Sequence, residues 1–146
     1  MASIKRQQIL ESIAFCEKNG YFEKLNEKSM QVAWQIKSRT TLRNRAIVVL
    51  LPKSIEVVYA DIGIMYSCNI FSNLDVKTPI ERLNNILKAL NPIGIITNDK
   101  GMTLVDILPT MFTINIDHIE ANNYSEECIM EELNDQIDTD PFCIIN

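Results

Sequence analysis

The sequence predicts an α/β fold in which a mainly parallel sheet carries helices on both faces, and three observations lead to it. Residues 46–51 (AIVVLL) are a continuous apolar run, which is typical of a strand covered on both sides. Shorter apolar runs repeat this signal at 69–74, 93–97, 111–116 and 142–145. Helical patterns separate the runs, and strands that alternate with helices imply right-handed crossovers between parallel neighbours.

Three helices are expected in the first half of the chain. Residues 4–18 have helical spacing and end at Asn19-Gly20, and residues 23–38 place apolar side chains three and four positions apart. The third helix, 54–67, is apolar nearly all round, and its only charges are Glu56 and Asp61. A helix of that kind is buried on more than one side.

A capping box is predicted after the second strand. Thr78-Pro79-Ile80-Glu81 places a hydroxyl at the cap, proline at the first helical position and a carboxylate two positions later. The following helix is expected to bury a stripe of Ile80, Leu83, Leu87 and Leu90 and to stop near Asn91-Pro92. Two more helices are expected at 102–108 and 125–136, the second with an acidic, solvated face.

Length and composition predict one compact domain, or part of a larger one, over residues 1–146 with no internal boundary. The chain is 47% apolar, which supports a real core. Its formal net charge of −5 opposes a nucleic-acid partner, and the basic cluster of Lys37, Arg39, Arg43 and Arg45 is interpreted as a solvated surface. No apolar run is long enough for a membrane span or a signal peptide. The four cysteines form no C-x-x-C pair, so we expect reduced thiols and a cytoplasmic location.

Residues with catalytic potential are few. The four glycines are isolated, so no phosphate-binding turn is present, and Ser54 is interpreted as a helix cap. His118 is the only histidine, and Asp117 beside it could orient it as a base, but no nucleophile elbow accompanies it. A metal site of Asp117, His118 and Glu120 lacks a recognisable ligand spacing. Asp138 and Asp140 could bind a cation only weakly. We therefore predict no catalytic, cofactor-binding or metal-binding residue.

Four segments nevertheless resemble a known family in order and spacing. They are YFEKLNEKS at residues 21–29, VVLLPKSIE at 48–56, LDVKTPIERL at 74–83 and IITN at 95–98. Together they are similar to the N-terminal region of AMP-forming adenylating enzymes: amino-acid adenylation domains of peptide synthetases, D-alanine–carrier-protein ligases and acyl-CoA synthetases. Two features depart from the family pattern. Its K-A-G-G-A-Y segment reads YSCNIF at 66–71, and its early β-hairpin is missing before Tyr21.

The resemblance implies an activity for a parent protein. In the family, a carboxylate attacks the α-phosphorus of ATP, with Mg²⁺, and the acyl adenylate is transferred to a carrier-protein or CoA thiol. The strand at 140–146 would lead into the family's phosphate loop, and the sequence ends at Asn146. We therefore expect a truncated N-terminal piece that is inactive alone, holds neither ATP nor Mg²⁺, and lacks the family's catalytic lysine.

Two alternatives remain open. The chain could be a free-standing, non-catalytic α/β binding or regulatory module, or, with less support, a hydrolase that uses His118. Because helix 54–67 needs cover on several sides, an exposed apolar face, or a self-association that covers it, is also expected.

Overall fold

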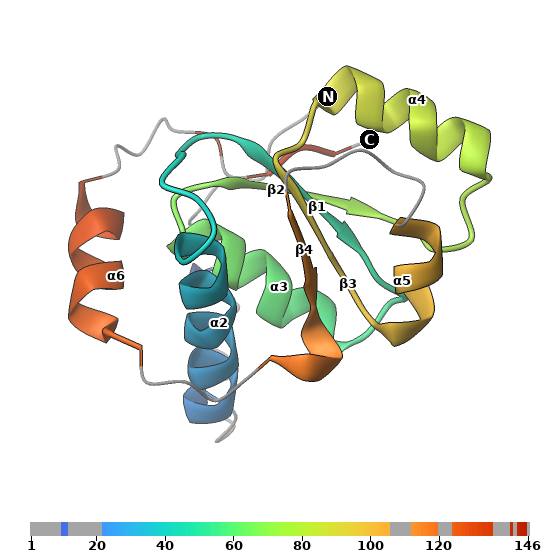
Figure 1. Cartoon of the computed structure of the whole chain (residues 1–146). Helices are drawn as coiled ribbons and strands as arrows, with labels where there is room; N and C mark the ends of the chain where they lie inside the picture. The colour runs from blue at the N-terminus through green and yellow to red at the C-terminus, as the bar shows by residue number, and fades with distance from the viewer. Residues whose placement is uncertain are drawn as a thin grey trace.

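A computed structural model shows a four-stranded, all-parallel sheet between two layers of helices (Figure 1). The structure describes residues 10–11, 22–105, 112–119, 124–135, 141 and 143–145. The strands lie in the order β2-β1-β3-β4. Their bounds are β1 Ala46–Leu50, β2 Ile70–Leu74, β3 Gly94–Thr97 and β4 Phe112–Asn115. The predicted α/β class with a parallel sheet is thus confirmed.

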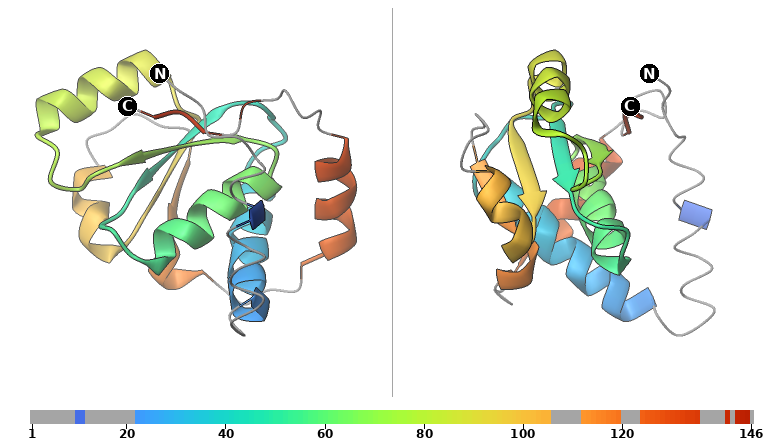
Figure 2. Two further views of the ribbon diagram at one scale, coloured as in Figure 1. Left: turned by 180° about the vertical axis from the view of Figure 1, so that it is seen from behind. Right: turned by 90° about the vertical axis from the view of Figure 1, so that its right-hand side faces the viewer.

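Helices cover both faces of the sheet, as predicted (Figure 2). On one face lie α2, α3 and α6; on the other lie α4 and α5. Their bounds are α2 Phe22–Lys37, α3 Ile55–Tyr66, α4 Ile80–Leu90, α5 Asp99–Val105 and α6 Glu126–Asn134. A short 3₁₀ turn, η1 (Ile116–His118), follows β4. Among the described helices, none combines the length and the apolar character that a bilayer crossing requires.

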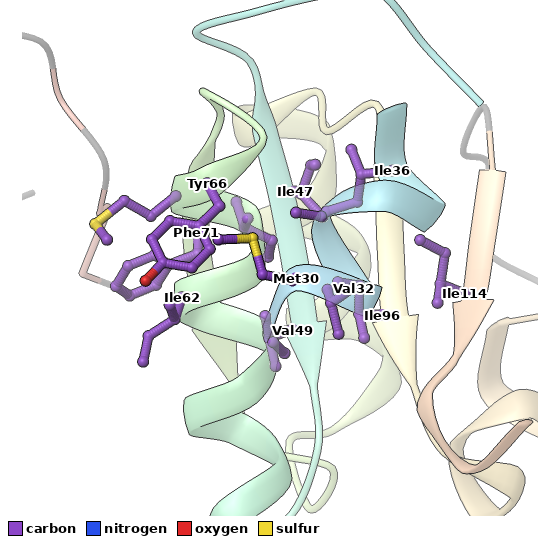
Figure 3. Packing of buried hydrophobic residues seen from close by; sticks show 14 of the residues in the cluster. Met30, Val32, Ile36, Ile47, Val49, Ile62, Tyr66, Phe71, Ile96 and Ile114 are labelled. Carbon is purple, nitrogen blue, oxygen red and sulfur yellow. The ribbon is translucent and has the colours of Figure 1, made fainter. Parts of the chain in front are cut away.

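Strand β1 shows why a continuous apolar run predicted this architecture. All five of its residues are buried. Successive side chains point to opposite faces, so Ile47 and Val49 join the core under α2 and α3, while Val48 and Leu50 join the core under α4 and α5. Figure 3 shows the first of these cores, with Met30 and Val32 of α2 near the side chains of the sheet.

Helices α2 and α3 pack in close contact at Gly63. A Cβ atom added there would lie 2.5 Å from Cβ of Val32, too near for any side chain. Glycine is therefore required by the close approach of the two helices. Burial of α3 is nearly complete in its second half, from Ile62 to Tyr66. Its first turns leave Ile55 52% and Val58 37% exposed, which is the exposed apolar surface on this helix; self-association through it stays a prediction.

The departure from the family pattern at 66–71 has a conformational meaning. Cys68 adopts a φ of 64° and is fully buried between α3 and β2. Positive φ favours glycine, which is the residue that the family's K-A-G-G-A-Y segment supplies there. In this chain the neighbouring Asn69 holds the turn, because its side-chain amide donates to the Leu42 and Ser67 carbonyl oxygens and its Oδ1 accepts from the Arg45 amide.

Two predicted helix caps are wrong in detail. Helix α4 begins after Pro79 without a side-chain cap, so the capping box between Thr78 and Glu81 does not form. The preceding turn is held by Asp75, whose carboxylate accepts from the Lys77 amide. Ser54 does stand at the cap of α3, but its hydroxyl donates to the Pro52 carbonyl oxygen instead of accepting from the helix.

The remaining elements differ from the sequence prediction in burial, in bounds or in extent. On α4, Leu83 and Leu87 are buried as expected, whereas Ile80 is 37% exposed. Helix α5 begins at Asp99, three residues before the predicted start. The predicted strand at 142–145 is represented by a parallel bridge between Cys143 and Phe71 on the outer edge of β2. The predicted helix at 4–18 lies outside the described residues, apart from 10–11.

Candidate functional site

The carboxyl ends of all four strands meet at one edge of the sheet, where open α/β sheets bind ligands. Two cavities lie at this edge. The first, which we call the α3 cavity, has a volume of about 410 Å³ and lies between the ends of β1 and β2 and the first turns of α3. Its walls are mostly apolar, with four polar side chains among them: Val49, Leu51, Val57, Val58 and Leu74 with Lys53, Ser54, Asn73 and Asp75.

The second cavity, which we call the α5 cavity, lies beyond the ends of β1 and β3. The order of the strands reverses at this place. Strand β2 lies on one side of β1, and β3, which comes next in the chain, lies on the other side. The cavity has a volume of about 490 Å³ and is lined by Pro52, Val76, Asn98, Lys100, Gly101, Thr103 and Leu104. Gly101 lets α5 approach β3, since a Cβ there would lie 1.9 Å from Oγ1 of Thr97. That hydroxyl is itself fixed by donating to the Leu50 carbonyl oxygen at 2.8 Å.

Asp61 is the most unusual titratable residue of the described chain. It follows Val57 and Val58 by one turn of α3, so the three side chains share a helix face. Its Oδ2 accepts a hydrogen bond of 2.9 Å from Nδ2 of Asn73, which lines the α3 cavity. Its Oδ1 is buried and accepts no hydrogen bond from the described residues. Burial raises the pKa of this carboxyl to about 7, although the Asn73 amide acts in the opposite direction.

A second polar cluster surrounds Asp99 at the ends of β3 and β4. Oδ1 of Asp99 accepts from Nδ2 of Asn115 at 2.7 Å and lies 2.7 Å from Nε2 of His118. Asp117 accepts from the Asp99 backbone amide at 3.0 Å. The cluster is open to solvent: the side chains of His118 and Asp99 are 68% and 60% exposed. Hydrogen bonds from Asn115 and then from His118 lower the pKa of Asp99.

The cluster bears on the hydrolase alternative. The structure pairs His118 with Asp99 and not with its sequence neighbour Asp117, which instead holds the start of α5. An exposed imidazole whose acceptor partner is a surface carboxylate lacks the enclosure that activates a nucleophile. The arrangement is that of a surface contact between α5 and η1.

No metal centre is found in the described part of the chain, where no group of three or more histidine, cysteine, aspartate or glutamate side chains could hold an ion. Glu120, Asp138 and Asp140, which the sequence raised as weak candidates, lie outside the described residues.

The basic cluster of the sequence is divided among intramolecular partners. Lys37 and Arg43 both pair with Glu132 of α6, the second at 3.1 Å. Hydrogen bonding from Lys37 is the main reason that the pKa of Glu132 is lowered. Arg39 donates to the carbonyl and side-chain oxygens of Gln35. The Lys37 pair joins α2 to α6, and the Arg43 pair joins the loop after α2 to α6. These contacts use part of the positive charge that a phosphate backbone would need.

Asp61 is the site residue that sequence reasoning missed. The available signal was an ionisable residue inside a helix that is otherwise apolar nearly all round, which marks a buried charge. The sequence does not show that the side chain meets Asn73 beside a cavity, because that contact depends on how α3 lies across β2.

Comparison with known proteins supports the resemblance found in the sequence. No model of a known protein family matches the chain. Cyclosporin synthetase of Tolypocladium inflatum is 32% identical over 69 residues. These residues cover 47% of this chain, but so small a share of the synthetase that it rounds to 0%. D-lysergyl-peptide-synthetase subunit 1 of Epichloe festucae var. lolii is 24% identical over 102 residues, 68% of this chain and 3% of that protein. The chain therefore spans only a small part of the peptide synthetases that it matches.

Solved structures share the fold. The nonribosomal peptide synthetase FmoA3, in its form bound to α-methyl-L-serine-AMP, superposes on 99% of this chain and 16% of its own with a TM-score of 0.67 and 11% identity. A four-domain nonribosomal peptide synthetase bound to AMP and glycine covers 75% of this chain and 8% of its own, with a TM-score of 0.64 and 20% identity. A fatty acid AMP ligase from Legionella pneumophila covers 69% and 19%, with a TM-score of 0.63 and 14% identity. The resemblance to AMP-forming adenylating enzymes that the sequence predicted is thus confirmed, and the chain has the fold of a small part of such proteins.

Proposed function

We propose that this chain is the N-terminal part of an ATP-dependent ligase that activates a carboxylic acid as its acyl adenylate. One observation carries the proposal: 99% of the chain superposes on part of a peptide synthetase whose structure contains an amino acid joined to AMP. In the proposed reaction a carboxylate oxygen attacks the α-phosphorus of ATP, and the bond to the β-phosphate oxygen breaks to release pyrophosphate. The acyl group then passes to a carrier-protein or CoA thiol, and AMP leaves.

In this proposal the described residues support the site and do not perform the chemistry. The two cores fix β1, β2 and β3 in register, so the loops at their carboxyl ends are held in place. ATP and Mg²⁺ would be bound by other parts of the parent protein, which the proposal places in the cytoplasm. Cys128, an exposed free thiol on α6, fits a reducing compartment.

Pyrophosphate exchange by the complete protein tests the proposal. A panel of amino, aryl and fatty acids should contain at least one acid that stimulates incorporation of labelled pyrophosphate into ATP. No stimulation by any acid, with a folded protein, would contradict the ligase. Isothermal titration calorimetry of the 146-residue chain is the second test, and we expect no tight binding of ATP with Mg²⁺.

A non-catalytic binding module is the second candidate, and the α3 cavity is the observation that favours it. The cavity volume of about 410 Å³ lies in the range of small-molecule sites, and its apolar walls with a few polar groups are typical of them. The two candidates differ in a simple way, since a module would bind its ligand without consuming ATP.

A further inference from the structure

Another cavity, which we call the Glu132 pocket, lies at the opposite edge of the sheet, where strands β1 and β2 begin. Its walls come from the end of α2, the loop between α2 and β1, the end of α3 and helix α6. The volume of about 240 Å³ is smaller than that of most sites for drug-sized ligands, so the pocket suits a small ion. Its polar lining residues are Lys37, Thr40, Thr41, Arg43, Ser67 and Glu132.

Two cations converge on one carboxylate oxygen in this pocket. Nζ of Lys37 and Nη2 of Arg43 both pair with Oε2 of Glu132, the second at 3.1 Å. The Lys37 side chain is only 14% exposed, so the surrounding protein holds most of it in place. The geometry therefore already binds an oxyanion, which here is a carboxylate of the protein itself.

The pocket has more positive charge and more hydrogen-bond donors than Glu132 can use. Two cations face one carboxylate, so one positive charge is left uncompensated among the described side chains of the pocket. A guanidinium has five N–H donors and an ammonium has three, whereas Glu132 is the one described side chain that Arg43 and Lys37 contact as donors. A small anion with several acceptor oxygens is the complementary ligand.

Hydroxyl groups add to these donors. The Thr40 hydroxyl oxygen accepts from the Leu42 amide at 3.1 Å, so its hydrogen stays available to a ligand. The Thr41 side chain lines the same wall. A tetrahedral oxyanion has enough oxygens to accept from two cations and from hydroxyls on one side of it, which a carboxylate with two oxygens has not.

The positive charge is local to this part of the chain. Residues 28–55 contain six basic side chains and no acidic one, although the whole chain has a formal net charge of −5. A single oxyanion needs only this local charge, whereas a nucleic-acid backbone needs positive charge along an extended surface. The charge distribution therefore favours one small anion over a polyanion.

We propose that the Glu132 pocket binds a phosphate group, as inorganic phosphate or as a phosphate monoester, between the side chains of Lys37 and Arg43, with the Thr40 and Thr41 hydroxyls as further donors. Glu132 uses the same two cations and repels the ligand, so it limits the affinity. The site is independent of the ligase proposed above, because it lies at the other edge of the sheet and requires neither ATP nor a carboxylic acid.

Isothermal titration calorimetry of the 146-residue chain tests the proposal with sodium phosphate and with methyl phosphate, at an ionic strength held constant with sodium chloride. We expect one site per chain and a dissociation constant on the order of millimolar for so small a ligand. Tighter binding of methyl phosphate would identify a monoester as the ligand, and tighter binding of inorganic phosphate would identify the free ion. The absence of saturable binding for both ions would overturn the proposal.

Glu132→Gln gives the sharpest test, because removal of an acidic side chain should strengthen binding. The variant keeps the shape of the side chain but no longer competes for the cations, so the dissociation constant for phosphate should fall by about threefold or more. Glu131→Gln is the matched control: it removes the same charge from the same helix, at a residue that does not line the pocket. It should leave binding unchanged. Equal strengthening in both variants would contradict the assignment of the pocket.

Two variants of the loop locate the donors. Arg43→Gln should abolish saturable binding of phosphate. Arg39→Gln removes an equal charge from the same loop, but Arg39 donates to Gln35 and does not line the pocket, so binding should be unchanged. Thermal unfolding confirms that each variant is folded. Equal weakening by the two substitutions, or binding that survives Arg43→Gln, would show general attraction to the loop and would overturn the proposal.

Discussion

Asp61 and Asp99 are both hydrogen-bonded to an asparagine, yet their carboxyl pKa values move in opposite directions. Asp61 lies against the sheet, where burial raises its pKa to about 7 despite the donor Asn73. Asp99 lies in solvent, where the donors Asn115 and His118 lower its pKa. Hydrogen bonding favours the charged form at both places, so exposure to water decides the outcome. The comparison shows that the polar cluster at the ends of β3 and β4 is already satisfied, whereas the carboxyl beside the α3 cavity is not.

Asp61→Asn gives the largest expected effect. A raised pKa means that the folded state holds a proton that the unfolded state releases, so stability falls as the pH rises from about 4 to about 7. The change from the ordinary value of 3.8 to about 7 corresponds to about 4 kcal/mol in the free energy of unfolding. We therefore expect Asp61→Asn to be more stable than the natural chain by up to about 4 kcal/mol near pH 8. Urea unfolding measures this difference.

The same variant should lose its advantage in acid. Near pH 4 and below, Asp61 is protonated in the folded chain, so Asp61→Asn and the natural chain should unfold at similar urea concentrations. An advantage that is equal at both pH values would show that the carboxyl is ionised without cost, and the contrast with Asp99 would then disappear.

Asn73→Ala should have the next largest effect. It removes the hydrogen-bond donor that the described residues supply to the Asp61 carboxylate, so the pKa of Asp61 should rise above about 7. Near pH 8 the loss of this hydrogen bond should cost about 1 kcal/mol in the free energy of unfolding. A carboxyl NMR titration follows the pKa, and an unchanged value would mean that Asn73 does not hold the carboxylate in solution.

Asn115→Ala applies the same change to the exposed carboxyl. The Asn115 amide is the main cause of the lowered pKa of Asp99, so the pKa should rise toward its ordinary value. Asn115→Asp should raise it further, because a like charge replaces the donor while the oxygen that accepts from the Asp117 amide is kept. NMR titration of Asp99 in both variants measures this order, and the reverse order would contradict the hydrogen-bond explanation.

His118→Ala is expected to have the smallest effect. The imidazole is the second contributor to the pKa of Asp99, so its removal should raise that pKa less than Asn115→Ala does. The thermal midpoint should not change, because the pair is exposed to solvent. In the complete protein, His118→Ala should leave pyrophosphate exchange intact, and loss of the exchange in a folded variant would show that His118 takes part in the adenylation reaction.

Much of the fold could be predicted because its signals are local and strong. The apolar run that became β1 required cover on two faces, and the helical spacing that became α2 and α4 required one buried side. The helix caps could not be predicted in the same way, because the rotamer of a serine or threonine side chain decides which nearby group its hydroxyl binds. The Ser54 hydroxyl therefore donates to the Pro52 carbonyl oxygen, and at the start of α4 the cap position is held by Pro79 and not by Thr78.

The contacts of the candidate site depend on elements that are distant in sequence. Asp99 meets His118 because η1 turns back toward the start of α5 after β4. Asp61 meets Asn73 because α3 crosses the edge strand β2 next to Asn73. The sequence singles out His118 as the only histidine and Asp61 as a charge on an apolar helix, but it carries no information about these approaches. The α3 cavity likewise forms only where β1, β2 and α3 come together.

The absence of a side chain at Gly63 limits how this pair of helices can change in sequence. A Cβ atom at position 63 would lie 2.5 Å from Cβ of Val32 and 2.9 Å from the backbone carbonyl oxygen of Ser29. Alanine at position 32 would relieve neither contact, because alanine keeps its Cβ and the Ser29 oxygen belongs to the backbone. We therefore expect glycine at position 63 among homologous chains, and a library randomised at positions 32 and 63 should yield folded members only with glycine at 63.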